Sequence, residues 1–134
     1  MNIGTLLVLL LAAPASALAC EQRAVLPEHL QVDDAAHFYV VAIRRAHGAN
    51  LVATVQRSFG GAWSPGQTVT IQFEQQGLPD AVCELEARGG ETWLLNLRPV
   101  GGALRVSPFD SRNVPHNHER FATWVRDIEA AVSP

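Results

Sequence analysis

The stretch HFYVVAIRRAHGANLVATVQRSF, residues 37–59, decides the fold class of this chain. Its first part, His37–Ala46, is rich in β-branched and aromatic residues, which favour a strand. The letters HGAN that follow are typical of a turn, and Leu51–Phe59 alternates between two faces. One of these faces is formed by Leu51, Ala53, Val55 and Arg57. The stretch therefore predicts an antiparallel β-hairpin.

Three further strands are predicted downstream of this hairpin. Gln67–Phe73 alternates strictly, and Glu91–Val100 and Ala103–Phe109 are rich in apolar residues. The last two are joined by Gly101-Gly102, and a glycine pair fits a tight hairpin in which positive φ is needed. Five short strands cannot leave both faces of a sheet in water, so the pattern predicts closure into a small antiparallel barrel.

The C-terminal part of the chain changes from strand to helix periodicity. In PHNHERFATWVRDIEAAV, residues 115–132, apolar side chains recur at helical spacing and charged ones lie mostly between them. The apolar face consists of Phe121, Trp124, Val125, Ile128 and Val132. The sequence thus predicts a mainly β domain of five strands, followed by an amphipathic helix that packs on the barrel.

The first 19 residues have the form of an export signal. Ile3–Ala13 is an apolar run of signal-peptide length, and Ala17-Leu18-Ala19 places small residues at the positions that a signal peptidase reads. We expect cleavage before Cys20, with a secreted or periplasmic domain at 20–134. A lipid anchor on Cys20 is the alternative, although the order Ala17-Leu18 reverses the usual lipoprotein pattern.

Composition limits the remaining possibilities. A chain of 134 residues with 48% hydrophobic residues fits one folded domain, which we expect to be monomeric. The net charge is −3 and the sequence has no basic stripe, so nucleic-acid binding is not expected. Two cysteines in an exported chain suggest one disulfide, Cys20–Cys83. It would close a loop of about 64 residues and stabilise the fold by about 4 kcal/mol.

The order of these segments resembles the netrin-like domain, in particular the N-terminal domain of the tissue inhibitors of metalloproteinases. The likeness spans nearly the whole mature chain and is one of pattern. It is carried by Cys20, FYVVAIRRA, LVATVQRSFGG, GQTVTIQF, Cys83, ETWLLNL and GGALRVSPF. The resemblance implies an OB-type barrel, and it maps the family's first disulfide onto Cys20 and Cys83. The family's second bridge has no counterpart, since Gln22 and Phe109 stand where its cysteines would be.

The resemblance also implies a function, inhibition of a zinc metallopeptidase. In that family the free α-amine and the carbonyl oxygen of the first cysteine chelate the zinc of the peptidase, a role that falls on Cys20. A catalytic zinc keeps an open position that such a pair can occupy. Cys20, Glu21 and Gln22 would form the inhibitory edge. Glu21 departs from the usual Thr or Ser, and burying its charge in an apolar pocket is unfavourable unless it is paired.

One other function stays open beside inhibition. The domain could be a non-inhibitory ligand- or protein-binding OB module, with Cys20–Cys83 only a structural bridge. An enzyme is not expected, because no nucleophile elbow or HExxH motif is present, and no cofactor is implied.

A few other residues are weaker candidates for sites. His116 and His118 could offer imidazoles to a metal, but the pattern favours solvated residues. The other histidines, His29, His37 and His47, are scattered and more typical of a surface. Asp33-Asp34 is interpreted as a solvated loop, Trp63 as a possible exposed patch, and Trp93 and Trp124 as core.

Overall fold

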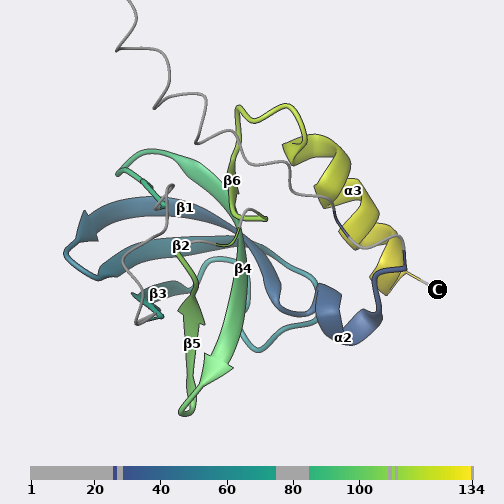
Figure 1. Ribbon diagram of the computed structural model, residues 1–134, viewed down its shortest axis with the longest axis horizontal. Helices are drawn as coiled ribbons and strands as arrows, with labels where there is room; N and C mark the ends of the chain where they lie inside the picture. The colour runs from purple at the N-terminus through teal and green to yellow at the C-terminus, as the bar shows by residue number, and fades with distance from the viewer. Residues whose placement is uncertain (1–25, 27–28, 75–84, 109, 111, 134) are drawn as a thin grey trace, which may run out of the picture.

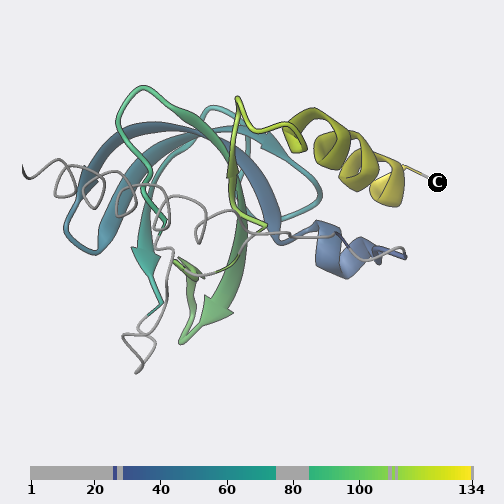
Figure 2. The same ribbon diagram turned by 45° about the horizontal axis from the view of Figure 1, so that its top comes forward.

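The computed structural model describes residues 26, 29–74, 85–108, 110 and 112–133. Its elements in chain order are α2 (Val32–Ala35), β1 (Phe38–His47), β2 (Asn50–Ser58), β3 (Thr68–Phe73), β4 (Thr92–Val100), β5 (Ala103–Val106), β6 (Val114–Pro115) and α3 (Phe121–Val132). The strands wrap into a barrel, and α2 and α3 lie side by side against one flank of it (Figures 1 and 2).

The five long strands form a closed ring. Their order is β1-β2-β3-β5-β4, and an additional pairing between β4 and β1 completes the circle. The short β6 adds to β4 through Trp93↔Pro115 and Leu94↔Val114. The predicted mainly β fold, a five-stranded OB-like barrel with one C-terminal helix, is therefore confirmed.

One seam of the barrel is parallel. β3 and β5 run in the same direction over Gln72↔Arg105 and Phe73↔Val106, whereas every other strand pair of the described sheet is antiparallel. The reason is the odd number of strands. Strand directions can alternate all the way round a closed ring only when the number of strands is even, so a ring of five needs at least one parallel pair.

Two hydrophobic cores lie on opposite faces of β1 and β4. The core inside the barrel includes Tyr39, Val41, Ile43, Leu51, Ala53, Val55, Val69, Ile71, Trp93, Leu95, Leu97 and Val106. The core between barrel and helices includes Leu26, Ala35, Phe38, Val40, Phe59, Leu94, Val114, Trp124, Val125 and Ile128. Because both of their faces are covered, β1 and β4 have nearly continuous apolar sequences, while β2 and β3 alternate as predicted.

The C-terminal helix buries the face that the sequence predicts. Trp124, Val125 and Ile128 are buried, and Phe121 and Val132 pack against the same core. The helix begins at Phe121, later than the start of the 115–132 segment, because Pro115 is taken into β6. Arg57 of β2 forms an ion pair with Glu129 of α3 at the edge of this contact.

Three glycines are required, two by a turn and one by a close contact. Gly101 and Gly102 have φ of 60° and 82° and form the predicted tight turn, in which Val100 faces Ala103. Gly61 is needed for a different reason: a Cβ there would overlap Tyr39 Oη and would also lie 2.5 Å from the carbonyl oxygen of Ala36. Trp63, two residues after Gly61, is half-buried, and the centroid of its ring lies 5.3 Å from that of the Tyr39 ring.

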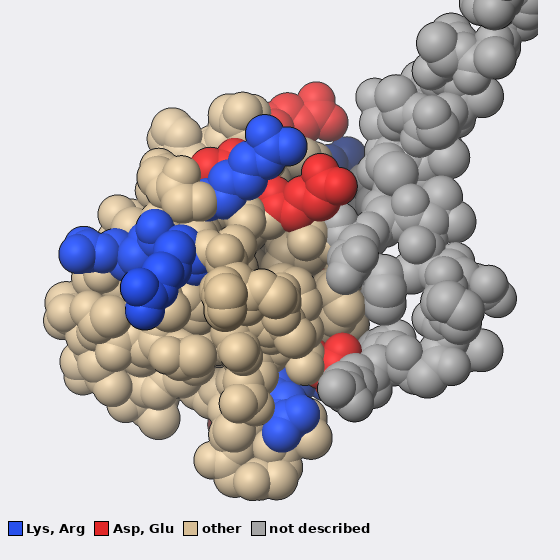
Figure 3. Space-filling model, turned by 90° about the vertical axis from the view of Figure 1, so that its left-hand side faces the viewer, with Lys and Arg blue, Asp and Glu red and all other residues tan. Residues whose placement is uncertain are grey.

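The described residues contain no helix that is both long and apolar enough to cross a membrane. Figure 3 shows the end of the barrel that carries the β1–β2 hairpin. Arginine side chains gather in small groups there, acidic side chains lie close to some of them, and uncharged residues separate the groups. Among the described residues on this face, no continuous band of one charge is visible.

Candidate functional site

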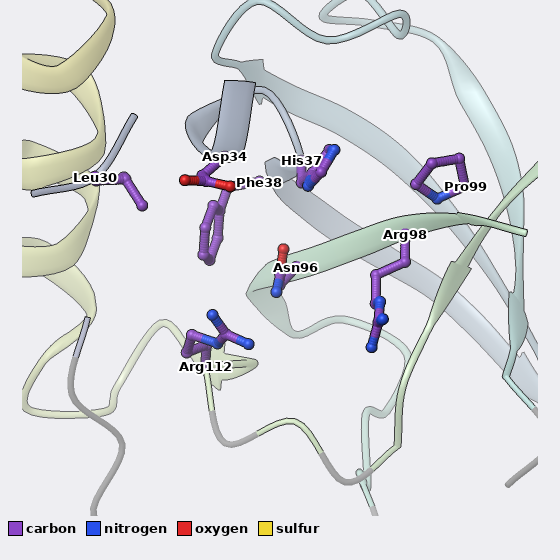
Figure 4. A pocket seen from close by; sticks show the side chains of 8 residues that line it. All are labelled: Leu30, Asp34, His37, Phe38, Asn96, Arg98, Pro99 and Arg112. Carbon is purple, nitrogen blue, oxygen red and sulfur yellow. The ribbon is translucent and has the colours of Figure 1, made fainter. Parts of the chain in front are cut away.

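A hollow of about 510 Å³ lies where α2, the start of β1, the second half of β4 and the segment before β6 meet. Its lining combines apolar and charged side chains, as ligand sites commonly do. Figure 4 shows the lining residues, which are Leu30, Asp34, His37, Phe38, Asn96, Arg98, Pro99 and Arg112. Phe38 is 2% exposed and Leu30 packs against the core under the helices, so the apolar part is continuous with that core.

The register between β1 and β4 places the centre of the hollow. Phe38 and Asn96 are paired across these two strands, on the outer face of the barrel. Along that face of β4 the side chains change from the fully buried Leu94 to the buried Asn96 and then to the exposed Arg98. The helices therefore cover Leu94, and the hollow opens at Asn96.

A largely buried carboxylate organises one side of the hollow. The Asp110 side chain is 10% exposed, and its Oδ1 accepts hydrogen bonds from the backbone N and from Nε of Arg112, each at 3.0 Å. Its Oδ2 accepts a hydrogen bond from Asn96 Nδ2 at 2.9 Å. Asp110 thus links the Arg112 guanidinium to β4, and charge-assisted bonds of this kind are the stronger ones.

Asn113 holds the same segment against the barrel. Its Oδ1 accepts a hydrogen bond from the backbone N of Asn96 at 2.8 Å, and its Nδ2 donates to the carbonyl oxygen of Ser107 at 2.9 Å. Asn113 is 8% exposed, so these bonds are shielded from water. The position of Arg112 is therefore set by two neighbouring side chains that are both anchored on β4.

The charges around the hollow are only partly paired. Arg112 is paired with Asp110 through Nε alone, and its side chain stays 40% exposed. Asp34 and Arg98 are exposed and form no ion pair with any described residue. Figure 4 shows Asp34 and Arg112 on opposite sides of the hollow, with the Phe38 ring between them. The site therefore presents separated positive and negative groups over an apolar floor.

The residues singled out for zinc chelation and for the disulfide, Cys20, Glu21, Gln22 and Cys83, lie outside the described residues. The same holds for the predicted signal segment, residues 1–19. Leu26 is the first described residue of the domain, and it packs in the core under the helices. Leu85, two residues after Cys83, donates its backbone N to the carbonyl oxygen of Pro108.

The histidines do not converge. The His116 ring contacts Phe121 at 5.5 Å and the His118 ring lies 6.2 Å from Trp124, while His118 Nδ1 accepts a hydrogen bond from the backbone N of Arg120. In the described part of the chain, no three metal-ligating side chains come together. His29 and His47 are exposed, as the sequence suggests, whereas His37 lines the hollow.

Other expectations are also settled by the structure. Trp93 and Trp124 are buried, as predicted, and Trp63 is half-buried against Tyr39 rather than a freely exposed patch. Asp33-Asp34 is not a loop but lies in the short helix α2, which brings Asp34 to the rim of the hollow. The prediction of a loop was therefore wrong for this pair, whereas both side chains are exposed to solvent as predicted.

The polar members of this site were missed at the level of sequence. Asn96, Asp110 and Arg112 come from two segments that carry no recognised motif. One signal was available: Asn96 is the single polar residue within the apolar run WLLNL. A polar side chain at such a position needs a buried partner, and Asp110 is that partner.

Comparison of the chain with family models, with curated proteins and with solved structures finds no match.

Proposed function

We propose that this chain is an exported ligand-binding module in which an OB-like barrel and two helices shape the hollow around Asn96. The observation that carries the proposal is that Asp110 holds Arg112 in place by hydrogen bonds. Its Nε and backbone N both bind one oxygen of the buried Asp110, while the other oxygen binds Asn96 on β4. The terminal guanidinium nitrogens form no hydrogen bond or ion pair with a described residue and stay available at the rim of the hollow.

The energetics of the network support a role in binding. Taking a carboxylate out of water costs several kcal/mol unless charged and polar partners compensate, so the pair between the largely buried Asp110 and the partly exposed Arg112 is a poor source of stability. What the Asp110 network does provide is orientation, because it limits the rotamers of a long and flexible side chain. A side chain that is ordered before binding loses less entropy when a ligand arrives.

The experiment that tests this proposal is an NMR titration of the ¹⁵N-labelled mature protein. The panel consists of inorganic phosphate, acetate, glucose, L-leucine and a mixture of tripeptides. We expect at least one member to shift the amide signals of Phe38, Asn96 and Arg112 together. Asp110→Asn should weaken that binding about tenfold, since the neutral amide no longer pairs with the guanidinium.

Asp127→Asn is the matched control, because Asp127 is exposed on α3 and away from the hollow. It should leave the titration unchanged. The proposal is overturned if no panel member moves signals around the hollow, or if both variants weaken binding equally.

A second candidate function is inhibition of a zinc metallopeptidase through the α-amine and carbonyl oxygen of Cys20. The observation that favours it is the architecture, since a five-stranded OB-like barrel with a C-terminal helix is what the resemblance to the inhibitor family implies. We expect the protein that begins at Cys20 to inhibit a zinc peptidase, and a form with one alanine ahead of Cys20 to lose the inhibition. Equal potency of the two forms would exclude chelation and leave the binding module intact.

A further inference from the structure

We infer that the hollow binds a zwitterionic ligand, a molecule that carries an ammonium and a carboxylate group, as an α-amino acid or a short peptide does. The inference rests on the proposed function and assigns the chemistry of the ligand. It follows from the separation of donors and acceptors across the hollow.

The donor side is formed by Arg112. A guanidinium has five N–H groups, and Nε is the one that binds Asp110. The terminal nitrogens keep the planar arrangement that matches the two oxygens of a carboxylate. Figure 4 shows the Arg112 guanidinium at the side of the hollow opposite Asp34, below the Phe38 ring. Arg98 adds a second positive charge further along β4.

The acceptor side is formed by Asp34 and Asn96. An ionised carboxylate only accepts hydrogen bonds, so the Asn96 atom that faces Asp110 has to be Nδ2. This contact fixes the amide orientation and leaves Oδ1 on the other side. Figure 4 shows the Asn96 oxygen on the side of Asp34, away from Arg112. A carboxylate and an amide oxygen together suit an ammonium group.

The charges around the hollow favour a zwitterion over a ligand with a single charge. The two positive groups, Arg98 and Arg112, are offset by the carboxylates of Asp34 and Asp110, so these four side chains together carry no net charge. A simple anion on Arg112 would leave Asp34 unpaired, and a simple cation on Asp34 would leave the guanidinium end unpaired. A zwitterion satisfies both, and its apolar substituent can lie against Leu30 and Phe38.

The size of the hollow agrees with this class. Its 510 Å³ falls within the range of about 300–1,000 Å³ that is common for small-molecule sites. Both an amino acid and a dipeptide can therefore be accommodated. The two differ in the spacing between their charges, and the experiment below separates them.

The test compares four probes on the ¹⁵N-labelled mature protein: L-leucine, leucyl-leucine, N-acetyl-L-leucine and L-leucinamide. The last two keep only the carboxylate or only the ammonium. We expect L-leucine or leucyl-leucine to bind at least about tenfold more tightly than either single-charge probe. The tighter of the two zwitterions identifies the charge spacing that the site prefers.

Two variants assign the charges to residues. Arg112→Gln should weaken the binding of N-acetyl-L-leucine and of both zwitterions but not the binding of L-leucinamide. Asp34→Asn should weaken the binding of L-leucinamide and of both zwitterions but not the binding of N-acetyl-L-leucine. Arg126→Gln and Asp33→Asn are the matched controls, since both residues are exposed and do not line the hollow. Thermal unfolding checks that each variant folds. If Arg112→Gln does not fold, Arg112→Lys keeps the charge, loses the planar fork and should weaken the carboxylate probes.

Three results would overturn the inference. If N-acetyl-L-leucine binds as tightly as the zwitterions, the hollow is an anion site and the proposed binding function survives. If phosphate, glucose or acetate shifts the signals of the hollow but none of the four leucine probes does, only the zwitterion assignment fails. If nothing in either panel shifts those signals, the inference and the proposed function both fail.

Discussion

Asn113 Oδ1 accepts a hydrogen bond from the backbone N of Asn96 at 2.8 Å, across a sequence separation of 17 residues. The bond joins the outer face of β4 to the segment that precedes β6. Both residues are buried, with 7% and 8% of their surface exposed. The segment that carries Asp110 and Arg112 is therefore attached to the barrel at the point where the hollow opens.

Replacement of this side chain should destabilise the protein. Asn113→Ala removes the acceptor and leaves the buried backbone N of Asn96 without it, which is expected to lower the free energy of unfolding by about 1–3 kcal/mol. Urea denaturation measures the change. Asn117→Ala is the control, because Asn117 is exposed and should tolerate the change. An equal effect of the two substitutions would show that the Asn113 bonds contribute nothing to stability.

The contact between Gly61 and Tyr39 predicts a second effect. A methyl group at position 61 overlaps Tyr39 Oη and approaches the carbonyl oxygen of Ala36, so Gly61→Ala should shift the backbone and destabilise the fold by roughly 1–3 kcal/mol. The midpoint of thermal unfolding and the fluorescence of the tryptophans, including the neighbouring Trp63, report the change. Ser64→Ala, at an exposed position close by, should leave both unchanged. A midpoint that does not fall in Gly61→Ala would contradict the close approach.

The attachment of α3 should depend on packing far more than on its ion pair. Ile128 is fully buried, so Ile128→Ala should lower the free energy of unfolding by about 2–5 kcal/mol. Glu129→Gln breaks the ion pair with Arg57, in which the Arg57 side chain is 47% exposed and the Glu129 side chain 39% exposed. This substitution should change the free energy of unfolding by about 0–1 kcal/mol. Chemical denaturation of the two variants gives the comparison. A larger effect of Glu129→Gln would reverse this assignment.

The predicted processing and disulfide have a direct readout. Intact-mass spectrometry of the exported protein should find a chain that begins at Cys20 and is two hydrogens lighter than its reduced form. Cys83→Ser should then lower the free energy of unfolding by about 4 kcal/mol, because a loop of about 64 residues is no longer closed. An acylated Cys20 would instead support the lipid anchor, and an unprocessed chain would contradict the signal segment.

The elements of this fold were largely predictable because each is encoded by a local period. The alternation of Val69 and Ile71 indicates a half-covered strand, and the spacing of Trp124, Val125 and Ile128 indicates a helix with one buried face. Gly101-Gly102 indicates the tight turn between β4 and β5. A closed ring of five strands must contain a parallel pair, although the prediction was an antiparallel barrel, and the tertiary structure decides that this pair is β3 and β5.

The candidate site was not predictable in the same way. No local pattern relates Asp34 to Asn96 or to Arg112, which come from α2, from β4 and from the segment before β6. Asn96 alone stood out, as a polar residue in an apolar run. Its partner Asp110 lies 14 residues further on, and nothing in the intervening sequence indicates that they meet.

The sequence by itself determined the strand and helix pattern, the hairpin turns and the buried face of α3, because these depend on side-chain periodicity and backbone preference within short segments. The tertiary structure decided where the hollow lies and how it is charged. The register that pairs Phe38 with Asn96 places an apolar floor beside a buried amide, and hydrogen bonds from Asn96 to Asp110 and Asn113 hold the segment that carries Arg112 at its edge. Such a site depends on contacts between distant segments, which only the folded chain creates.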